Sequence, residues 1–221
     1  MIRLTGARVK RVEDPRLLRG RGRYVADLVL PGMLSVAFVR SPHAHAEVRG
    51  IDPAPARALP GVIAVVTAAN LRDVIRPLAP RLEGGGFTPT VWSALAAARV
   101  RFVGEAVAAV AAEGAALAAD AREAVTVSYG PLPAVTSIEA GLAAGHILFR
   151  REWRRGDVDA AFATAPHVLR ETLSHGRCAP APLEPRGVVA DWDGTTLTVW
   201  ASTQTPQILR AALAGALGLS E

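Results

Sequence analysis

The sequence has little of several residue types, and each shortage excludes a class of protein. Its single cysteine, Cys178, excludes an internal disulfide and any zinc or iron–sulfur site built on several cysteine ligands. No apolar run is long enough and free enough of charge to span a bilayer. Residues 1–14 lack the apolar core of a signal peptide. These absences predict a cytoplasmic protein that does not enter the membrane.

What remains is the composition of a folded protein. The chain has 221 residues, of which 50% are hydrophobic and 20% are charged. This length and balance allow one large domain or two small ones, each with a real core.

Positive charge is concentrated near the N-terminus. Residues 1–23 carry eight basic and two acidic side chains, a net charge of +6, whereas the whole chain carries +5. The RGRGR run at 19–23 raises the possibility of RNA binding. No series of aromatic residues for base stacking accompanies these arginines, so we expect no nucleic-acid partner.

The first half alternates between strand and helix patterns, which predicts a mixed α/β layer. Residues 67–74 read as a short helical turn capped by Thr67. Residues 100–113 read as two short strands or as one strand bent at Gly104. The other expected elements are strands at 33–41, 61–67 and 125–129 and a helix at 114–125.

The second half predicts a strand, a proline-rich loop, a hairpin and a helix. Asp157 is placed to cap a short helix, and residues 167–175 alternate between apolar and polar like a half-buried strand. Asp193-Gly194 is typical of a type I′ turn, with positive φ at both residues. A helix begins at Pro206 and stops at Gly218. The uncovered strands and the end at residue 221 lead us to expect a partner chain or a continuation.

Several candidate sites are better explained by ordinary structural roles than by binding or catalysis. The GGGF run at 84–87 neither follows a clear strand nor opens a helix, so we interpret it as a loop and not as a phosphate cradle. His43 and His45 have no third ligand nearby in the sequence, which favours turn or surface histidines over a metal site. Cys178 beside prolines is more typical of a buried thiol than of a nucleophile paired with His175.

The Glu184-Pro185-Arg186 element stands in a loop stiffened by proline. Pro182 and Pro185 are expected to hold Ala181 and Glu184 extended. Such rigidity suits a backbone held close to a bound group. The structural alternative is a Glu184–Arg186 pair that ties the loop to its neighbours.

Taken in order, segments along the whole chain resemble one enzyme family. They resemble the molybdenum-binding large subunit of the xanthine dehydrogenase, aldehyde oxidase and carbon monoxide dehydrogenase family. The matching segments include RVEDPRLLRGRGRYVADLVLPGMLSVAFVRSPHAHAEV (11–48), IDPAPARALPGVIAVVTAANL (51–71), VRFVGEAVAAVAAE (100–113), VTVSYGPLPAV (125–135), GDVDAAFATAPHVLRETLSHGR (156–177), PLEPRGVVADWDGTTLTVWASTQTPQILR (182–210) and LGLSE (217–221).

The resemblance implies an α+β fold in which an α/β hammerhead domain precedes the beginning of a molybdopterin-binding domain. We expect an N-terminal arm at 1–18, the hammerhead at 19–135 and an incomplete molybdopterin-binding domain at 136–221. The family's cofactor is a molybdenum–pterin, often as the cytosine dinucleotide, whose dithiolene holds the metal. FAD and [2Fe–2S] are expected only on partner subunits.

This sequence also departs from the family pattern. The Gly-rich loop that follows a segment like LGLSE and the family's catalytic glutamate are absent, so no catalytic residue and no protein metal ligand is expected. A glutamine that some members place over the molybdenum aligns with Cys178. The resemblance therefore implies Cys178, Glu184 and Gln204 as residues facing the cofactor pocket, with Arg186 a structural partner of Glu184.

Two hypotheses follow. The first is that the chain is part of a molybdenum hydroxylase large subunit. Such an enzyme hydroxylates an aldehyde, an N-heterocycle or a similar carbon centre with oxygen from water. It is inactive until the rest of the subunit, or a chain carrying it, completes it and FAD and iron–sulfur subunits join it. The alternative is a non-catalytic hammerhead remnant that serves as an interaction or assembly module.

Overall fold

Two compact units make up the chain. The structure is a computed structural model that describes residues 5–78, 90–145 and 147–221, so the GGGF run lies outside the described residues. One unit combines residues 1–32 with 176–206, and the other combines residues 33–175 with 207–221. The units interleave along the sequence, whereas the predicted domains follow one another. None of the described helices is long and apolar enough to cross a membrane.

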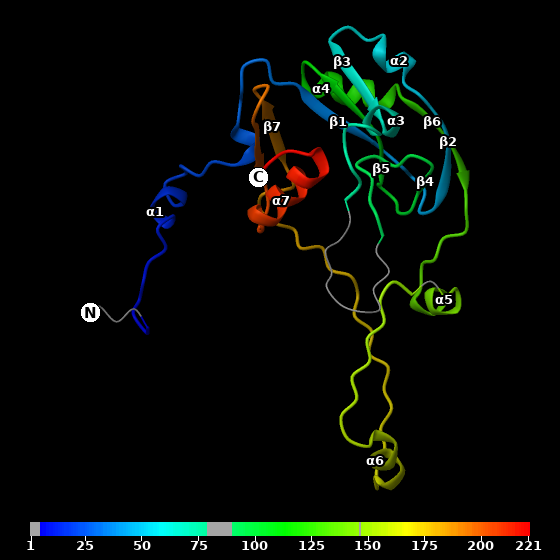
Figure 1. Cartoon of the computed structure of the whole chain (residues 1–221). Helices are drawn as coiled ribbons and strands as arrows, with labels where there is room; N and C mark the ends of the chain where they lie inside the picture. The colour runs from blue at the N-terminus through cyan, green and yellow to red at the C-terminus, as the bar shows by residue number, and fades with distance from the viewer. Residues whose placement is uncertain (1–4, 79–89, 146) are drawn as a thin grey trace. The chain divides into compact units, whose positions relative to one another are not determined.

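The larger unit is built on two antiparallel sheets of three strands each (Figure 1). The first has the order β1 (Ser35–Arg40), β5 (Ala106–Ala112), β3 (Val62–Thr67). The second has the order β4 (Arg99–Val100), β2 (Ala46–Asp52), β6 (Thr126–Pro131). Strand β5 pairs with a neighbour along both edges, so its backbone groups are satisfied. Strand β2 pairs along its length with β6 but meets β4 only at Ala46 and Glu47.

Small apolar residues form the core of this unit. The central strand β5 reads AVAAVAA, and Val107 and Val110 are fully buried. Helix α4 (Ala115–Glu123) packs against this sheet through the buried side chains of Ala118 and Ala121 (Figure 1). Alanine at the contact lets the helix backbone approach the sheet closely, and interior packing leaves little room for larger side chains.

Local sequence patterns correctly predicted most of these elements. The strands at 33–41, 61–67 and 125–129 and the helix at 114–125 are confirmed within a few residues. The region 100–113 forms two strands, with Gly104 in the turn between them. Thr67 precedes α3 (Ala68–Leu71), and its N–H and hydroxyl both donate to Asn70 Oδ1, at 2.8 and 3.0 Å.

Several short elements were not predicted. They are β2 in the larger unit, with α2 (Ala54–Arg57) and α5 (Ile138–Ala143), and α1 (Asp14–Leu17) and the 3-10 turn η1 (Val25–Asp27) near the N-terminus. The short helices have fewer than two turns, which is too little sequence for a helical period to be recognised.

The second half contains a confirmed hairpin and two confirmed helices. Strands β7 (Val188–Trp192) and β8 (Leu197–Ala201) pair antiparallel. Asp157 caps α6 (Val158–Thr164) by accepting the Ala160 N–H at 2.9 Å, and α7 spans Pro206–Leu217. The predicted mixture of helix and sheet in an α+β fold is confirmed.

Two local predictions in this half are wrong. Residues 167–175 form no strand and are all exposed, because a strand needs a neighbour for its backbone hydrogen bonds and no described strand pairs with them. At the hairpin, Gly194 has a φ of +98°, but Asp193 does not share a positive φ. Instead Asp193 Oδ1 accepts the N–H groups of Thr195 and Thr196, at 2.8 and 2.7 Å.

Candidate functional site

The carboxylate of Glu184 ties the proline-rich loop to the N-terminal segment of the same unit. Its Oε1 accepts a hydrogen bond from the Val25 N–H at 3.0 Å, and the residue is half-buried. Val25 is the first residue of η1, so its N–H group has no partner within the turn. Because the acceptor is a charged carboxylate, the Val25–Glu184 hydrogen bond is stronger than one to a neutral acceptor. This interaction joins positions 159 residues apart in the sequence.

The expected Glu184–Arg186 pair does not form. The salt bridges among the described residues do not include it, and Arg186 is exposed. Ala181 was also expected to be extended, but its φ is +42°, a strained value for a residue with a Cβ. The clash with a following proline disfavours the right-handed helical region and does not fix the sign of φ.

Ser202 holds the end of this loop in place, a role that the sequence did not reveal. Its Oγ accepts the Gly187 N–H at 3.0 Å and lies 3.0 Å from the Pro185 carbonyl, to which its hydroxyl donates. The Ser202 N–H donates to the Gly187 carbonyl at 3.1 Å. The hydroxyl therefore fixes the end of the loop against the end of β8. No sequence motif marks it, because its partners are main-chain groups 15 and 17 residues away.

Gln204 lies two residues beyond this junction and is exposed. The turn that carries it is held by the Thr205 N–H, which donates to Thr203 Oγ1 at 3.1 Å. The structure thus brings the segments of Glu184 and Gln204 together through Ser202. Among the described residues no hydrogen bond to the Gln204 amide is found, so one donor group and one acceptor face outward.

Cys178 is not brought into this arrangement by any described contact. Its thiol is free and exposed, and its Sγ lies 3.8 Å from the Gly176 carbonyl, a contact within the same turn of chain. The expectation of a buried thiol is therefore wrong. The segment around it has neither helix nor strand to enclose the side chain.

The two histidines at 43 and 45 lie in the turn before β2 and have separate structural contacts. A ring nitrogen of His45 lies 2.7 Å from the Pro133 carbonyl, and the His43 ring meets Tyr129 edge-on at 5.0 Å. Burial raises the pKa of Tyr129. Within the ranges that the structure describes, no three His, Cys, Asp or Glu side chains gather in a way that could hold a metal ion.

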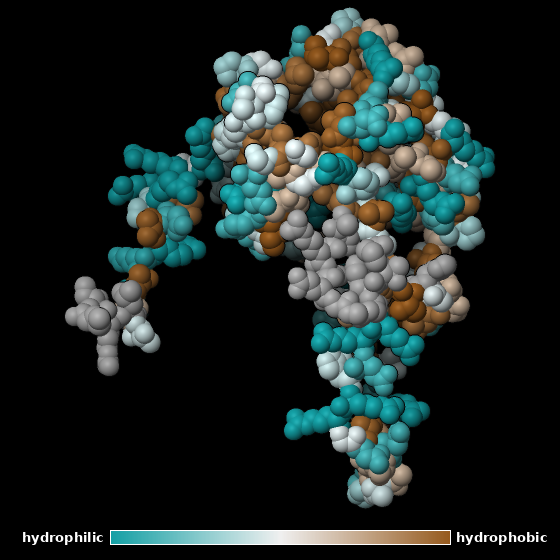
Figure 2. Space-filling model, in the orientation of Figure 1, coloured by the Kyte–Doolittle hydropathy of each residue, from teal (hydrophilic) through white to brown (hydrophobic). Residues whose placement is uncertain are grey.

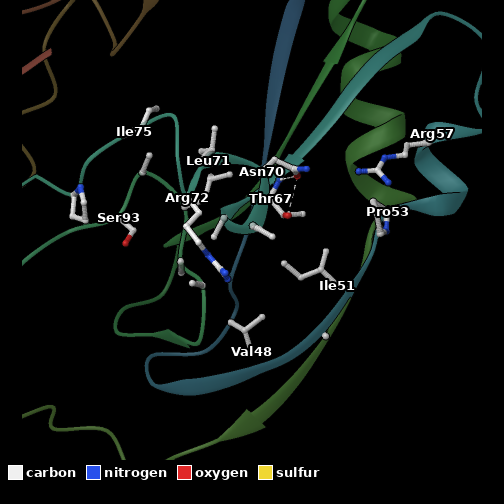
Figure 3. A pocket seen from close by; sticks show the side chains of 18 residues that line it. Val48, Ile51, Pro53, Arg57, Thr67, Asn70, Leu71, Arg72, Ile75 and Ser93 are labelled. Carbon is white, nitrogen blue, oxygen red and sulfur yellow. Dashed lines mark hydrogen bonds between the residues drawn. The ribbon is translucent and has the colours of Figure 1, made fainter. Parts of the chain in front are cut away.

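The larger unit contains an open pocket of about 540 Å³ between β2, α3 and residues 93–97 (Figure 3). Apolar side chains and two guanidinium groups line it, and Arg72 extends into it. Arg57 is held at the rim because its guanidinium donates to the Val65 carbonyl at 3.0 Å. None of the three predicted site residues lines this pocket.

Comparison with known protein families covers nearly the whole chain. The model "Aldehyde oxidase and xanthine dehydrogenase, a/b hammerhead domain" matches residues 19–133. A second model, "Molybdopterin cofactor-binding domain", matches residues 142–221. The chain belongs to the aldehyde oxidase and xanthine dehydrogenase family. The predicted order of a hammerhead domain and a molybdopterin-binding domain is confirmed, as is the molybdenum–pterin cofactor.

Curated relatives within this family are enzyme subunits. The nicotine 6-hydroxylase large subunit of Paenarthrobacter nicotinovorans is 39% identical over 98% of this chain and 28% of its own length. The carbon monoxide dehydrogenase large chain of Afipia carboxidovorans is 37% identical over 98% of this chain and 29% of its own. Their names mark them as the large components of multi-subunit proteins.

A solved structure shows the same relation. Quinoline 2-oxidoreductase from Pseudomonas putida 86 superposes with a TM-score of 0.89 and is 41% identical over 96% of this chain. The match covers 28% of that chain. This chain therefore spans little more than a quarter of the length of the relatives that it matches.

Proposed function

We propose that this chain forms part of the molybdenum-binding large subunit of a hydroxylase. The observation that carries the proposal is the succession of two family models, hammerhead and molybdopterin-binding, over residues 19–133 and 142–221. The hydroxylase works only when the rest of the subunit is present. FAD and [2Fe–2S] on partner subunits accept the electrons, and the cytoplasm is the proposed location.

The favoured substrate is the ring carbon of an N-heteroaromatic compound. Nicotine and quinoline, named for two of the relatives, share this chemistry. When bound, the molybdenum–pterin supplies the redox chemistry, in which C–H and water give C–OH with the release of two electrons and two protons. The carbon monoxide dehydrogenase relatives make oxidation of another small carbon substrate the competing possibility.

The side chains of this chain fit a role in binding and positioning the cofactor. Gln204 offers an amide and Cys178 a thiol at the surface, and a pterin edge has both donors and acceptors for such groups. We place Glu184 with them as a positioning residue, since its bond to Val25 fixes the loop that carries the site. A metal held by the sulfurs of its pterin needs no cluster of protein ligands.

The test is to purify the chain from its native cell, measure molybdenum per chain and identify the polypeptides that accompany it. We expect a molybdenum atom for each chain, together with the rest of the large subunit, carried on the same polypeptide or on one that accompanies it. A preparation that holds no molybdenum and lacks the rest of the large subunit would contradict the proposal and favour an assembly module without catalytic function.

Glu184 provides a test of the site itself. Glu184→Gln keeps an oxygen that accepts the Val25 N–H, whereas Glu184→Ala removes it. We expect the alanine variant of the complex to retain less molybdenum and pterin than the glutamine variant. Equal retention by both variants and the wild type would show that this bond does not position the cofactor.

A further inference from the structure

The open pocket of the larger unit combines positive charge with apolar walls. All of its described lining residues fall between 48 and 97, inside the region that matches the hammerhead model, so its described walls come from one domain. Its volume of about 540 Å³ lies within the range of about 300–1,000 Å³ that is usual for small-molecule sites. The pocket therefore has the size to enclose most of a small organic molecule.

Arg72 supplies a guanidinium group inside this pocket. The residue directly follows α3, and Figure 3 shows its side chain extending toward the wall that Val48 and Ile51 of β2 form. Within residues 5–78, 90–145 and 147–221, no carboxylate lies within salt-bridge distance of this guanidinium. A guanidinium presents parallel N–H groups that match the two oxygens of a carboxylate. Arg72 is therefore placed to bind an anion that enters the pocket.

Other polar groups of the lining also favour an anion. Arg57 adds a second positive charge at the rim, where its guanidinium is held by the Val65 carbonyl. Asn70 Oδ1 accepts both the N–H and the hydroxyl of Thr67, which leaves the amide nitrogen of Asn70 as a donor. No aspartate or glutamate is among the described residues that line the pocket. An anion would therefore meet positive charge and donors there, without a competing carboxylate.

Apolar side chains make up much of the remaining wall and favour a ligand with an apolar body. Leu71 and Ile75 belong to α3 and the residues after it, and the buried Leu95 belongs to the segment at 93–97. On the face seen in Figure 2, hydrophilic and hydrophobic side chains lie next to one another over α2 and α3. A small inorganic anion would leave the apolar wall in contact with water, whereas a ring or a hydrocarbon chain would cover it.

We propose that this pocket binds a small organic carboxylate with an aromatic or aliphatic body. The Arg72 guanidinium pairs with the carboxylate, Arg57 adds positive potential at the rim, and the apolar wall covers the body of the ligand. This binding activity does not rest on the proposed hydroxylase function, because hammerhead residues alone form the described walls.

The test is a calorimetric titration with benzoate of the protein purified from its native cell, together with every polypeptide joined to it. Benzoate combines a carboxylate with an aromatic ring, and benzamide has a similar shape without the negative charge. We expect benzoate to bind with a dissociation constant of about 1 mM or lower. Benzamide should bind at least about tenfold more weakly, because hydrogen bonds to a charged group are stronger than those to a neutral one.

Variants of two neighbouring arginines separate the pocket from general effects of charge. Arg72→Gln removes the guanidinium and should weaken benzoate binding at least about tenfold. Arg72→Lys keeps the charge without the fork of N–H groups, so its affinity should lie between those of Arg72→Gln and the wild type. Arg76→Gln is the matched control, because Arg76 is exposed and is not among the lining residues, and it should bind benzoate like the wild type. Both arginines are exposed, so thermal unfolding of the variants should match the wild type.

Three outcomes would overturn the proposal: no benzoate binding that depends on Arg72, equal weakening by Arg72→Gln and Arg76→Gln, or binding of acetate or inorganic phosphate as tight as that of benzoate. The first would show that the pocket takes no such ligand in the purified protein. The second would assign the effect to overall charge, and the third would show that the apolar wall does not contact the ligand. The comparison of benzoate with benzamide uses the wild type alone, so it does not depend on the folding of a variant.

Discussion

Gly61 occupies a position where a single methyl group should destabilise the hammerhead domain. It follows Pro60 and leads into β3 with a φ of +83°, which is unfavourable for any residue with a Cβ. A Cβ built on Gly61 would lie 2.7 Å from Leu117 Cδ2 and 3.3 Å from Glu113 Oε2. Both atoms are the ends of side chains on α4 or just before it, so the methyl group would displace the part-buried Leu117 side chain.

The cost of Gly61→Ala has two parts. The left-handed backbone costs about 1–2 kcal/mol for alanine, and the lower entropy of the unfolded chain offsets about 0.4–1 kcal/mol of it. Forcing the Leu117 side chain away from its preferred rotamer adds about 0.5–1.5 kcal/mol. We therefore expect the free energy of unfolding to fall by about 1–3 kcal/mol.

Gly104→Ala is the matched control for the backbone part alone. Gly104 has a φ of +92°, and a Cβ there would meet no atom within 4 Å. This variant should lose only about 1 kcal/mol. Urea unfolding of the full chain, followed by far-ultraviolet circular dichroism, measures both variants against the wild type. Equal losses for the two variants would refute the inferred close approach of Gly61 to Leu117.

Three further predictions concern other parts of the chain. Hydrogen bonds from the N–H groups of residues 196 and 195 lower the pKa of Asp193 below its ordinary value of 3.8. The ionised carboxylate therefore stabilises the hairpin fully above pH 3.8, and this stabilisation is lost as the pH falls through the lowered pKa. An amide titration by NMR should show the hairpin loosening in acid in the wild type but not further in Asp193→Asn; an identical acid response in both would contradict this assignment. Ser202→Ala removes the hydroxyl that accepts the Gly187 N–H, so we expect the free energy of unfolding to fall by about 1 kcal/mol and the Gly187 amide to exchange about fivefold faster. Unchanged exchange would show that Ser202 does not hold the end of the loop. A Cβ added at Gly215 in α7 would meet no atom within 4 Å, so Gly215→Ala should stabilise the helix by about 0.5–1 kcal/mol. Amide exchange within α7 should become slower, and faster exchange would contradict this prediction.

The fold of the first half was largely predictable because its elements carry their own patterns. The β-branched runs before Thr67 and the alanine-rich helix at 115–123 specify local structure with little help from distant residues. Asp157 and Thr67 likewise cap helices through atoms only three residues away. Such local causes can be read from the order of residues alone.

The site could be predicted only in part. The resemblance singled out Glu184 and Gln204, but nothing in the sequence showed that Glu184 would bond Val25 and not Arg186. Ser202 was missed because a hydroxyl bonding main-chain groups leaves no pattern. Residues 167–175 alternate like a strand, yet alternation does not supply a neighbouring strand.

The sequence by itself therefore determined the family, the α+β class, the capped helices and the hairpin, since these depend on contacts within a few residues or on a long ordered resemblance. The tertiary structure alone decided which atoms meet across long separations. Only folding brings Val25 to Glu184 and closes Ser202 on the loop end. These contacts depend on chain path and packing, which no local pattern of residues encodes.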